Sequence, residues 1–492
     1  MSYICTRTKE KVSSARAILR GLSPAGGLYV PEELPKAASD MLPFSKNTGY
    51  AERAAKVLRL FFPDLPGDSL DKIAEESYRR FDTPSVAPVH MLDDQTALLE
   101  LYHGPTLAFK DLALQVLPRL TLLAAQTLGE TREIAILTAT SGDTGKAALE
   151  GFSDVPGTSC TVFYPLDGVS KLQQKQMVTS AGKNTHVIAV RGNFDDAQTG
   201  VKSIFHDTAF AQKLSERNII LSSANSINIG RLVPQVAYYF SAWSDLVNEG
   251  RLRPDETLDV CVPTGNFGDI LAAWYAKHMG LPLGRLICAS NRNQVLTDFI
   301  QTGVYDIHRP FHKTISPSMD ILISSNLERL VFELLGRDEQ ALSKLMQKLK
   351  TDGRYELPAA ALSALQAEFT GAFADDKATV STIQSVWEKH HFLVDPHTAV
   401  GLHALALYRE KEPCRLTLVN ATASPFKFSQ DVGAAIGLTP GSDALQDAFR
   451  LAEAAGLPLP DAIAQLASAP VLHHTVTNID QMPQAVWDAL CR

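Results

Sequence analysis

The sequence has few cysteines, and no two of them form a paired motif. Six cysteines are scattered over 492 residues without a CxxC pair, a pattern typical of free thiols in a reducing compartment rather than of a disulfide framework. The histidines also lack metal-site spacing, because neither His390-His391 with His397 nor His473-His474 gives two histidines four residues apart beside acidic residues. We therefore expect no disulfide and no metal.

Long apolar runs and blocks of like charge are also missing. No run reaches the roughly 18 apolar residues that span a bilayer, and residues 1–11 are polar, without an apolar signal region. Lysine and arginine total 46 against 54 aspartate and glutamate, a formal charge of −8 without local clusters. This balance argues against nucleic acid or an acidic membrane as a partner. We expect a soluble, cytoplasmic protein.

Strand, turn and helix patterns alternate from residue 132 onward. Continuous apolar runs, each followed by a helical pattern, lie at 133–138, 161–164, 186–190, 218–221, 258–262 and 285–289. Continuous rather than alternating runs indicate parallel strands covered on both faces. The sequence therefore predicts an α/β fold with doubly wound, mostly parallel sheets, whose ligands bind at the carboxyl ends of the strands.

Changes in this rhythm suggest three domains. Residues 1–95 form an N-terminal mixed or helical domain. Residues 96–135 and 226–492 form a large domain, and residues 136–225 form a smaller α/β domain. Within the large domain, we expect a helical insertion at about 310–375 and a helical tail at about 444–492.

The segment 103–111, HGPTLAFKD, places a single lysine between a predicted strand and a predicted helix. Lys110 follows a Gly-Pro turn and has apolar neighbours, a setting in which desolvation lowers the pKa of an amine and frees its nucleophilic form. Such a lysine can form a Schiff base with an aldehyde, including that of pyridoxal phosphate. The alternative is an exposed lysine at a helix start, the usual position of this residue type. Pro118 should bend or interrupt the helix that follows.

Two loops after strands have the composition of anion-binding turns. The segment 263–269, PTGNFGD, can turn tightly and present several backbone N–H groups to a phosphate at a helix N-terminus. The segment 141–145, SGDTG, adds hydroxyls and a carboxylate, and 222–231, SSANSINIGR, is a third polar stretch. Each could equally be an ordinary turn or helix N-cap.

Taken together, these segments resemble the threonine synthase family. HGPTLAFKD at 103–111, TATSGDTG at 138–145 and GNFGD at 265–269 carry the resemblance, and 222–231 and SPSMD at 316–320 are similar to its longer, non-plant branch. The resemblance extends from about residue 26 to about residue 428. It implies the tryptophan-synthase-β-like fold, fold type II of the pyridoxal phosphate enzymes.

The resemblance also implies roles for individual residues. Lys110 would hold pyridoxal 5′-phosphate as a Schiff base, and Gly265, Asn266, Phe267 and Gly268 would bind its phosphate. Asp143 would lie near the 3′ oxygen of the ring, and Thr422 would face the pyridine nitrogen. Family members commonly have a histidine shortly after this threonine, where this chain has Ser424-Pro425-Phe426. Candidates for binding the substrate are Thr106, Ser141, Thr144, Asn225, Ser226 and Arg231.

The activity that the resemblance implies is a carbon–oxygen lyase reaction. O-phospho-L-homoserine and water would give L-threonine and phosphate by γ-elimination and β-replacement. Two alternatives remain open: a related lyase such as a dehydratase or phospholyase, and a non-catalytic binding protein with the same fold. The sequence leaves the oligomeric state open between monomer and homodimer.

Overall fold

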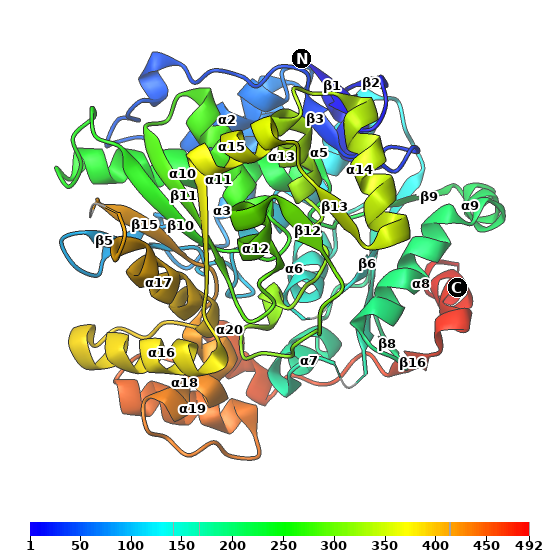
Figure 1. Cartoon of the computed structure of the whole chain (residues 1–492). Helices are drawn as coiled ribbons and strands as arrows, with labels where there is room; N and C mark the ends of the chain where they lie inside the picture. The colour runs from blue at the N-terminus through cyan, green and yellow to red at the C-terminus, as the bar shows by residue number, and fades with distance from the viewer. Residues whose placement is uncertain (141, 167, 413–414, 492) are drawn as a thin grey trace.

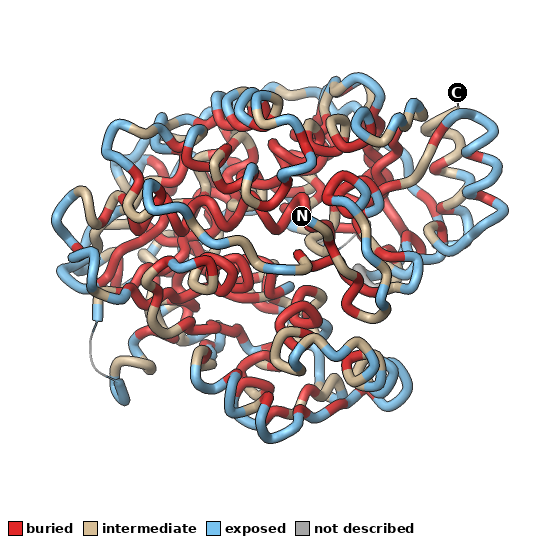
Figure 2. The backbone as a smooth tube through the Cα atoms, turned by 90° about the horizontal axis from the view of Figure 1, so that it is seen from above, coloured by how far each residue is buried: buried red, intermediate tan, exposed pale blue. Residues whose placement is uncertain are grey.

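Two mostly parallel β-sheets lie side by side, with helices packed on both faces of each (Figure 1). The structure is a computed structural model that describes residues 1–140, 142–166, 168–412 and 415–491. The strands run through the buried interior, and the exposed backbone lies mainly on the outer helices and connecting loops (Figure 2). The predicted doubly wound α/β fold is confirmed. Within the described ranges, no helix is long and apolar enough to cross a membrane.

The larger sheet has the strand order β14-β11-β10-β15-β5-β4. All neighbours are parallel except β4 and β5, which are antiparallel at one edge. Its strands are β4 (Val89–Met91), β5 (Thr96–Glu100), β10 (Leu258–Pro263), β11 (Leu283–Ser290), β14 (Phe369–Phe373) and β15 (Thr417–Ala421). Val260 and Val262 enter one hydrophobic core, whereas Cys261 enters the core on the opposite face. Both faces are therefore buried, which explains the continuous apolar run.

Different groups of helices supply the two cores of the large sheet. The core that contains Val260 is built with α2 (Tyr50–Phe61), α3 (Gly67–Tyr78), α10 (Ile229–Asn248), α11 (Gly268–Met279), α12 (Val295–Thr302), α13 (Leu327–Leu334) and α15 (Ala359–Glu368). The core that contains Cys261 is built with α16 (Asp376–His390), α17 (Pro396–Arg409), α18 (Ser429–Ala435), α19 (Ala444–Ala455) and α20 (Asp461–Ala464). This second group lies at the lower left of Figure 1.

The smaller sheet is entirely parallel, in the order β16-β8-β7-β6-β9. Its strands are β6 (Glu133–Ala139), β7 (Thr158–Pro165), β8 (Thr185–Val190), β9 (Ile219–Ser222) and β16 (Thr475–Thr477). One face packs against α5 (Leu117–Thr127), α6 (Asp143–Phe152) and α7 (Lys171–Val178). The other face packs against α8 (Phe194–His206), α9 (Thr208–Ser215) and α21 (Met482–Leu490).

The N-terminal region combines strands and helices. The strands β1 (Ser2–Cys5), β2 (Lys11–Ser13) and β3 (Tyr29–Pro31) form an antiparallel sheet, and α1 (Ser14–Arg20) follows β2. Arg329, at the start of α13, is fully buried and donates from Nε to the carbonyl of Tyr29 at 3.0 Å. Its Nη1 also contacts Asn326 Oδ1. Through Arg329, strand β3 of the N-terminal sheet therefore holds the segment 324–329 in place, and Asn326 of this segment contacts the loop at Asn266.

The predicted helical insertion contains strands that the sequence analysis missed. β14 extends the large sheet by pairing in parallel with β11. β13 (Arg354–Glu356) pairs antiparallel with β12 (Val304–Asp306), which lies just before the insertion, beside α14 (Glu339–Asp352). Gly371 in β14 allows a close approach to α12, because a Cβ there would lie 2.8 Å from the Cα of Thr297. That glycine weakened the strand signal in the sequence.

The predicted helical tail was also only partly correct. Its β16 joins the small sheet beside β8, so the end of the chain returns to the smaller sheet along the bottom of Figure 1. Two helices follow β8 rather than one, because Asp207 caps α9 by accepting from the Phe210 N–H at 2.9 Å. The interruption near Pro118 is confirmed: α4 (Asp111–Leu114) ends before α5 begins at Leu117.

Candidate active site

Lys110 lies in a turn that is held to the carboxyl end of β15. The Phe109 N–H donates to the carbonyl of Thr422 at 2.8 Å, and Ala108 and Ala423 form an isolated β-bridge. Within the turn, the N–H and hydroxyl of Thr106 donate to the carboxylate of Asp111 at 2.7 and 2.8 Å. Backbone hydrogen bonds on both sides therefore fix the position at which Lys110 leaves the chain.

The amine of Lys110 is desolvated, as the apolar surroundings in the sequence predicted. Its side chain is 10% exposed, and its Nζ lies 3.4 Å from Asp143 Oδ2, 3.4 Å from Ser318 Oγ and 4.7 Å from the ring centre of Phe109. Burial lowers the pKa of the amine, Asp143 opposes this shift, and the positive charges of Lys427 and Arg231 reinforce it. A fraction of neutral, nucleophilic amine is therefore available nearer to neutral pH.

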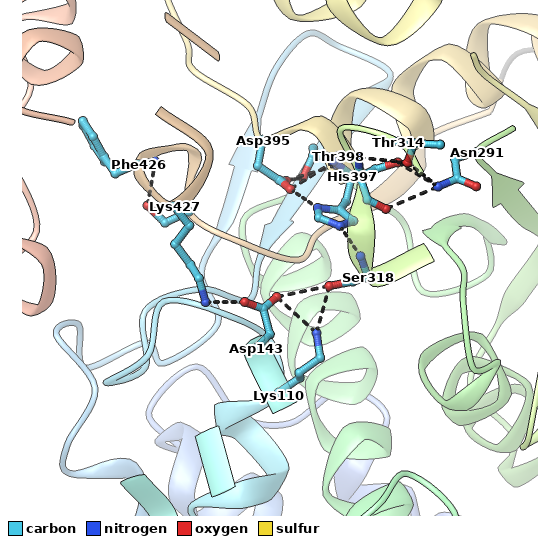
Figure 3. A network of polar contacts seen from close by, with 12 residues as sticks. Lys110, Asp143, Asn291, Thr314, Ser318, Asp395, His397, Thr398, Phe426 and Lys427 are labelled. Atoms are coloured by element: carbon cyan, nitrogen blue, oxygen red, sulfur yellow. Dashed lines mark hydrogen bonds and ion pairs between the residues drawn. The ribbon is translucent and has the colours of Figure 1, made fainter. Parts of the chain in front are cut away.

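A second buried lysine faces the other side of the Asp143 carboxylate (Figure 3). Lys427, in the 3-10 turn Pro425–Phe428 after β15, lies 2.7 Å from Asp143 Oδ1 and is 0% exposed. The same Nζ donates to the carbonyl of Thr106 at 2.9 Å, and Gln173 Nε2 donates to Asp143 Oδ1 at 3.1 Å. Despite the burial of Asp143, the charges of Lys427 and Lys110 hold the pKa of its carboxyl well below the usual range.

A hydroxyl completes the surroundings of the Lys110 amine (Figure 3). Ser318 lies in the 3-10 turn Pro317–Met319, and its Oγ donates to Asp143 Oδ2 at 3.2 Å. The Ser318 N–H donates to Nε2 of His397 at 3.1 Å, and His397 Nδ1 contacts Asp395 Oδ2 at 2.6 Å. Nε2 is thus the acceptor in this contact, and the Asp395–His397 pair positions the turn that carries Ser318.

The glycine loop after β10 forms a cradle of backbone N–H groups at the start of α11. Within the described ranges, the N–H groups of Asn266, Phe267 and Gly268 have no hydrogen-bond acceptor. The carbonyl of Asn266 accepts from the Asn326 N–H at 3.1 Å, so the loop is braced from behind while these N–H groups remain available. A Cβ on Gly265 would lie 2.6 Å from the carbonyl oxygen of Ser318. Free amides at a helix N-terminus suit a phosphate, and the close approach of Gly265 to Ser318 holds the loop against the Pro317–Met319 turn.

The first turn of α11 is held by a buried polar network. Asp269 accepts hydrogen bonds from the hydroxyls of Tyr238 and Tyr239 and from Asn420 Nδ2. Burial raises the pKa of Asp269, whereas these hydrogen bonds act in the opposite direction. Since Asn420 belongs to β15 and the tyrosines to α10, the network fixes the cradle relative to the Lys110 turn.

The remaining residues predicted to contact substrate have varied surroundings. The hydroxyl of Thr106 is engaged by Asp111, and Asn225 Oδ1 accepts from Thr138 Oγ1 at 2.7 Å. Ser226 Oγ lies 3.5 Å from Ser325 Oγ. Arg231 donates to the carbonyl of Ala224 at 2.9 Å, and burial lowers its pKa to about 10. Thr144 lies in the first turn of α6 and Thr422 directly after β15, whereas Ser141 is outside the described residues.

Two residues next to the Lys110 site were not predicted from the sequence: Lys427, which contacts Asp143, and His397, which accepts from the Ser318 N–H. Lys427 lies between two phenylalanines and resembles an ordinary lysine near a helix start. His397 was considered only as a metal ligand and rejected. Asp395-Pro396 could have indicated a helix N-cap, which Asp395 is. Neither signal, however, reveals the contacts with Asp143 and Ser318.

Known proteins resemble this chain over almost its full length. Residues 2–78 match the family described as Threonine synthase N terminus, and residues 93–416 match the family described as Pyridoxal-phosphate dependent enzyme. The threonine synthase of Pseudomonas aeruginosa is 39% identical over 92% of this chain and 94% of its own length. The solved structure of PLP-bound threonine synthase from Brucella melitensis is 38% identical, with a TM-score of 0.88 and complete coverage of both chains.

A further relative is longer than this chain. Human threonine synthase-like 1 is 40% identical over 86% of the chain, but the match spans only 58% of the relative's length. The fold and the relatives agree with the sequence motifs. This chain belongs to the threonine synthase family of pyridoxal-phosphate dependent enzymes.

Proposed function

We propose that the chain is a threonine synthase that binds pyridoxal 5′-phosphate and converts O-phospho-L-homoserine and water to L-threonine and phosphate. The observation that carries the proposal is the buried amine of Lys110, 3.4 Å from Asp143 and close to a cradle of free N–H groups. Membership of the threonine synthase family supports the choice of substrate.

The donor set fits the cofactor. Lys110 would hold it through Nζ, and the N–H groups of Asn266, Phe267 and Gly268 would bind its phosphate. Asp143 would lie near the 3′ oxygen, and the hydroxyl of Thr422 would face the pyridine nitrogen. When bound, pyridoxal phosphate supplies an electron sink for bond breaking beside the substrate amine.

The chain supplies proton transfer and substrate binding. Once the substrate amine has taken its place on the cofactor, the freed Nζ of Lys110 would move protons at the α and β carbons of the substrate, and its lowered pKa makes the basic, neutral form more available. The hydroxyl of Ser318, within 3.4 Å of that Nζ, can accept or return a proton locally. The substrate phosphate needs a second anion site, for which Thr106, Asn225, Ser226 and Arg231 are the candidates. Ser141 and Thr144 are further candidates for contacting the substrate. The N–H and hydroxyl of Thr106 already donate to Asp111.

An assay of the purified chain with O-phospho-L-homoserine tests the proposal. We expect phosphate and L-threonine in equal amounts, and neither product from the matched variant Lys110→Ala. Phosphate with a keto acid instead of threonine would indicate a related lyase. No turnover by a chain that binds the cofactor would indicate a binding protein.

Two further properties stay predictions. We propose a cytoplasmic location, which cell fractionation would test. A monomer or a homodimer is expected, and sedimentation of the purified chain would distinguish them.

A further inference from the structure

Lys427 is a buried cation that the proposed reaction does not otherwise use. Its side chain is 0% exposed, and its Nζ has two recorded contacts, with Asp143 Oδ1 at 2.7 Å and the Thr106 carbonyl at 2.9 Å. Lysine is almost never fully buried unless its charge is paired. Asp143 is therefore the ionic partner of Lys427.

The two lysines compete for one carboxylate. Lys427 lies 2.7 Å from Asp143, whereas Lys110 lies 3.4 Å from the other oxygen of the same group. With Lys427 charged, the Lys427–Asp143 pair is already neutral, and a proton on Lys110 would add an unbalanced positive charge to a buried site. Without Lys427, the proton on Lys110 would be the nearest charge able to balance Asp143.

We propose that Lys427 is a positioning residue that neutralises Asp143 and thereby allows the amine of Lys110 to lose its proton. The inference rests on the proposed role of Lys110 as the cofactor-binding lysine. Lys427 acts through Asp143 and through electrostatic repulsion, without contacting Lys110.

Other ionisable groups near Lys110 and Asp143 come from α10, α11 and α17. Arg231 from α10 also repels a proton on Lys110. Asp269 from α11 is held in its own network with Tyr238, Tyr239 and Asn420. His397 from α17 interacts electrostatically with Asp143, but its Nε2 accepts the Ser318 N–H.

One more carboxylate lies next to Lys110 in the chain. Asp111 accepts two hydrogen bonds from Thr106, and burial raises its pKa to about 6. Lys427 and Lys110 thus both contact the carboxylate of Asp143, and Lys427 supplies its closer positive charge.

Competitive acetylation tests the inference without any turnover. The purified full-length chain, freed of cofactor, is treated with trace acetic anhydride over a range of pH, and mass spectrometry gives the acetylated fraction of Lys110. Because only the neutral amine reacts, the midpoint of this curve reports the pKa of Lys110. The rate at which added pyridoxal phosphate is covalently captured gives a second curve. Circular dichroism verifies the fold of each variant.

Lys427→Gln removes the charge but keeps a donor for the Thr106 carbonyl. We expect both midpoints to rise by about one to three pH units, the usual effect of a nearby opposite charge that is no longer balanced. Lys427→Arg should stay close to the wild-type midpoint. The double variant Lys427→Gln with Asp143→Asn should return toward it, since the carboxylate is gone.

The matched control is Lys146→Met, which removes a lysine from the same helix as Asp143. Lys146 pairs with Glu150 at 3.0 Å rather than with Asp143, and its loss should leave the midpoint unchanged. A folded Lys427→Gln chain with the wild-type midpoint would overturn the inference.

If Lys427→Gln does not fold, the Lys110 midpoint of the variant Asp143→Asn tests the inference instead. This variant leaves Lys427 unpaired, so the Lys110 midpoint should fall, and an unchanged midpoint would refute the coupling. These curves need no substrate. A wild-type chain that makes no threonine would therefore refute the proposed function while leaving this test intact.

Discussion

Replacing Gly265 by alanine would probe the closest backbone approach in the candidate active site. A Cβ at this position would lie 2.6 Å from the Ser318 carbonyl oxygen and 3.4 Å from the Cα of Met319. A backbone oxygen cannot rotate away as a side chain can. Either the cradle or the turn at Pro317–Met319 must therefore move by roughly half an ångström or more.

The expected cost follows from this overlap. Overpacking at a well-packed position typically costs about 1–3 kcal/mol, which corresponds to a loss of about 5- to 150-fold in cofactor affinity if it falls on the bound state. Gly268 provides a matched control at the other end of the cradle. Its Cβ would meet Asn326 Nδ2 at 3.4 Å, an ordinary contact. Gly268→Ala should therefore bind the cofactor much more nearly like the wild type.

Titration of cofactor-free protein with pyridoxal phosphate, followed by absorbance, measures both affinities. Circular dichroism and thermal unfolding show whether each variant keeps the native fold. Equal affinities for wild type and Gly265→Ala would refute the requirement for a close approach. A lower Tm for Gly265→Ala with an unchanged Kd would place its role in folding alone.

Three other predictions address neighbouring groups. Lys110→Ala should abolish turnover and the adduct that borohydride traps on the wild type, as peptide mass spectrometry would show; normal turnover would remove the central assignment. Thr422→Ser should keep the product pattern, whereas Thr422→Asp should favour a protonated pyridine nitrogen and shift products toward keto acid, as chromatography would reveal; wild-type products from Thr422→Asp, with Thr422→Ser inactive, would place another residue at the nitrogen. The pKa of Asp111, raised by burial to about 6, lies above its unfolded value, so its stabilising contribution is complete below pH ~4 and is lost as pH rises through ~6, by up to about 3 kcal/mol. Denaturant unfolding at pH 4 and 7 should show this loss in the wild type and less of it in Asp111→Asn, and equal pH dependence in both would contradict the assignment.

Most of the fold could be read from the sequence, because buried parallel strands leave continuous apolar runs. β10 and β11 are such strands, buried on both faces. β14 was missed because Gly371 interrupts a short segment that follows a helix. β16 has three residues, two of them exposed, so it gives almost no local signal.

The candidate site could be proposed from the sequence wherever its residues lie in contiguous motifs. Lys110 and Gly265 occupy segments whose composition already indicates a reactive amine and an anion cradle. Lys427 and His397 are different, because their contacts join the 3-10 turn after β15 and helix α17 to residues far away in the sequence. The residues next to Lys427 in the sequence do not indicate that it pairs with Asp143, so this ion pair could be found only in the three-dimensional structure.

The return of the chain to the small sheet has a consequence for its synthesis. Thr475 pairs with Ile188 and Thr477 with Val190, so β16 is made almost 300 residues after the strand it joins. Until the ribosome releases this last part, β8 is an open edge, and unpaired edges favour contacts between chains. A nascent chain stalled or cut before residue 475 should therefore aggregate more readily than the finished protein.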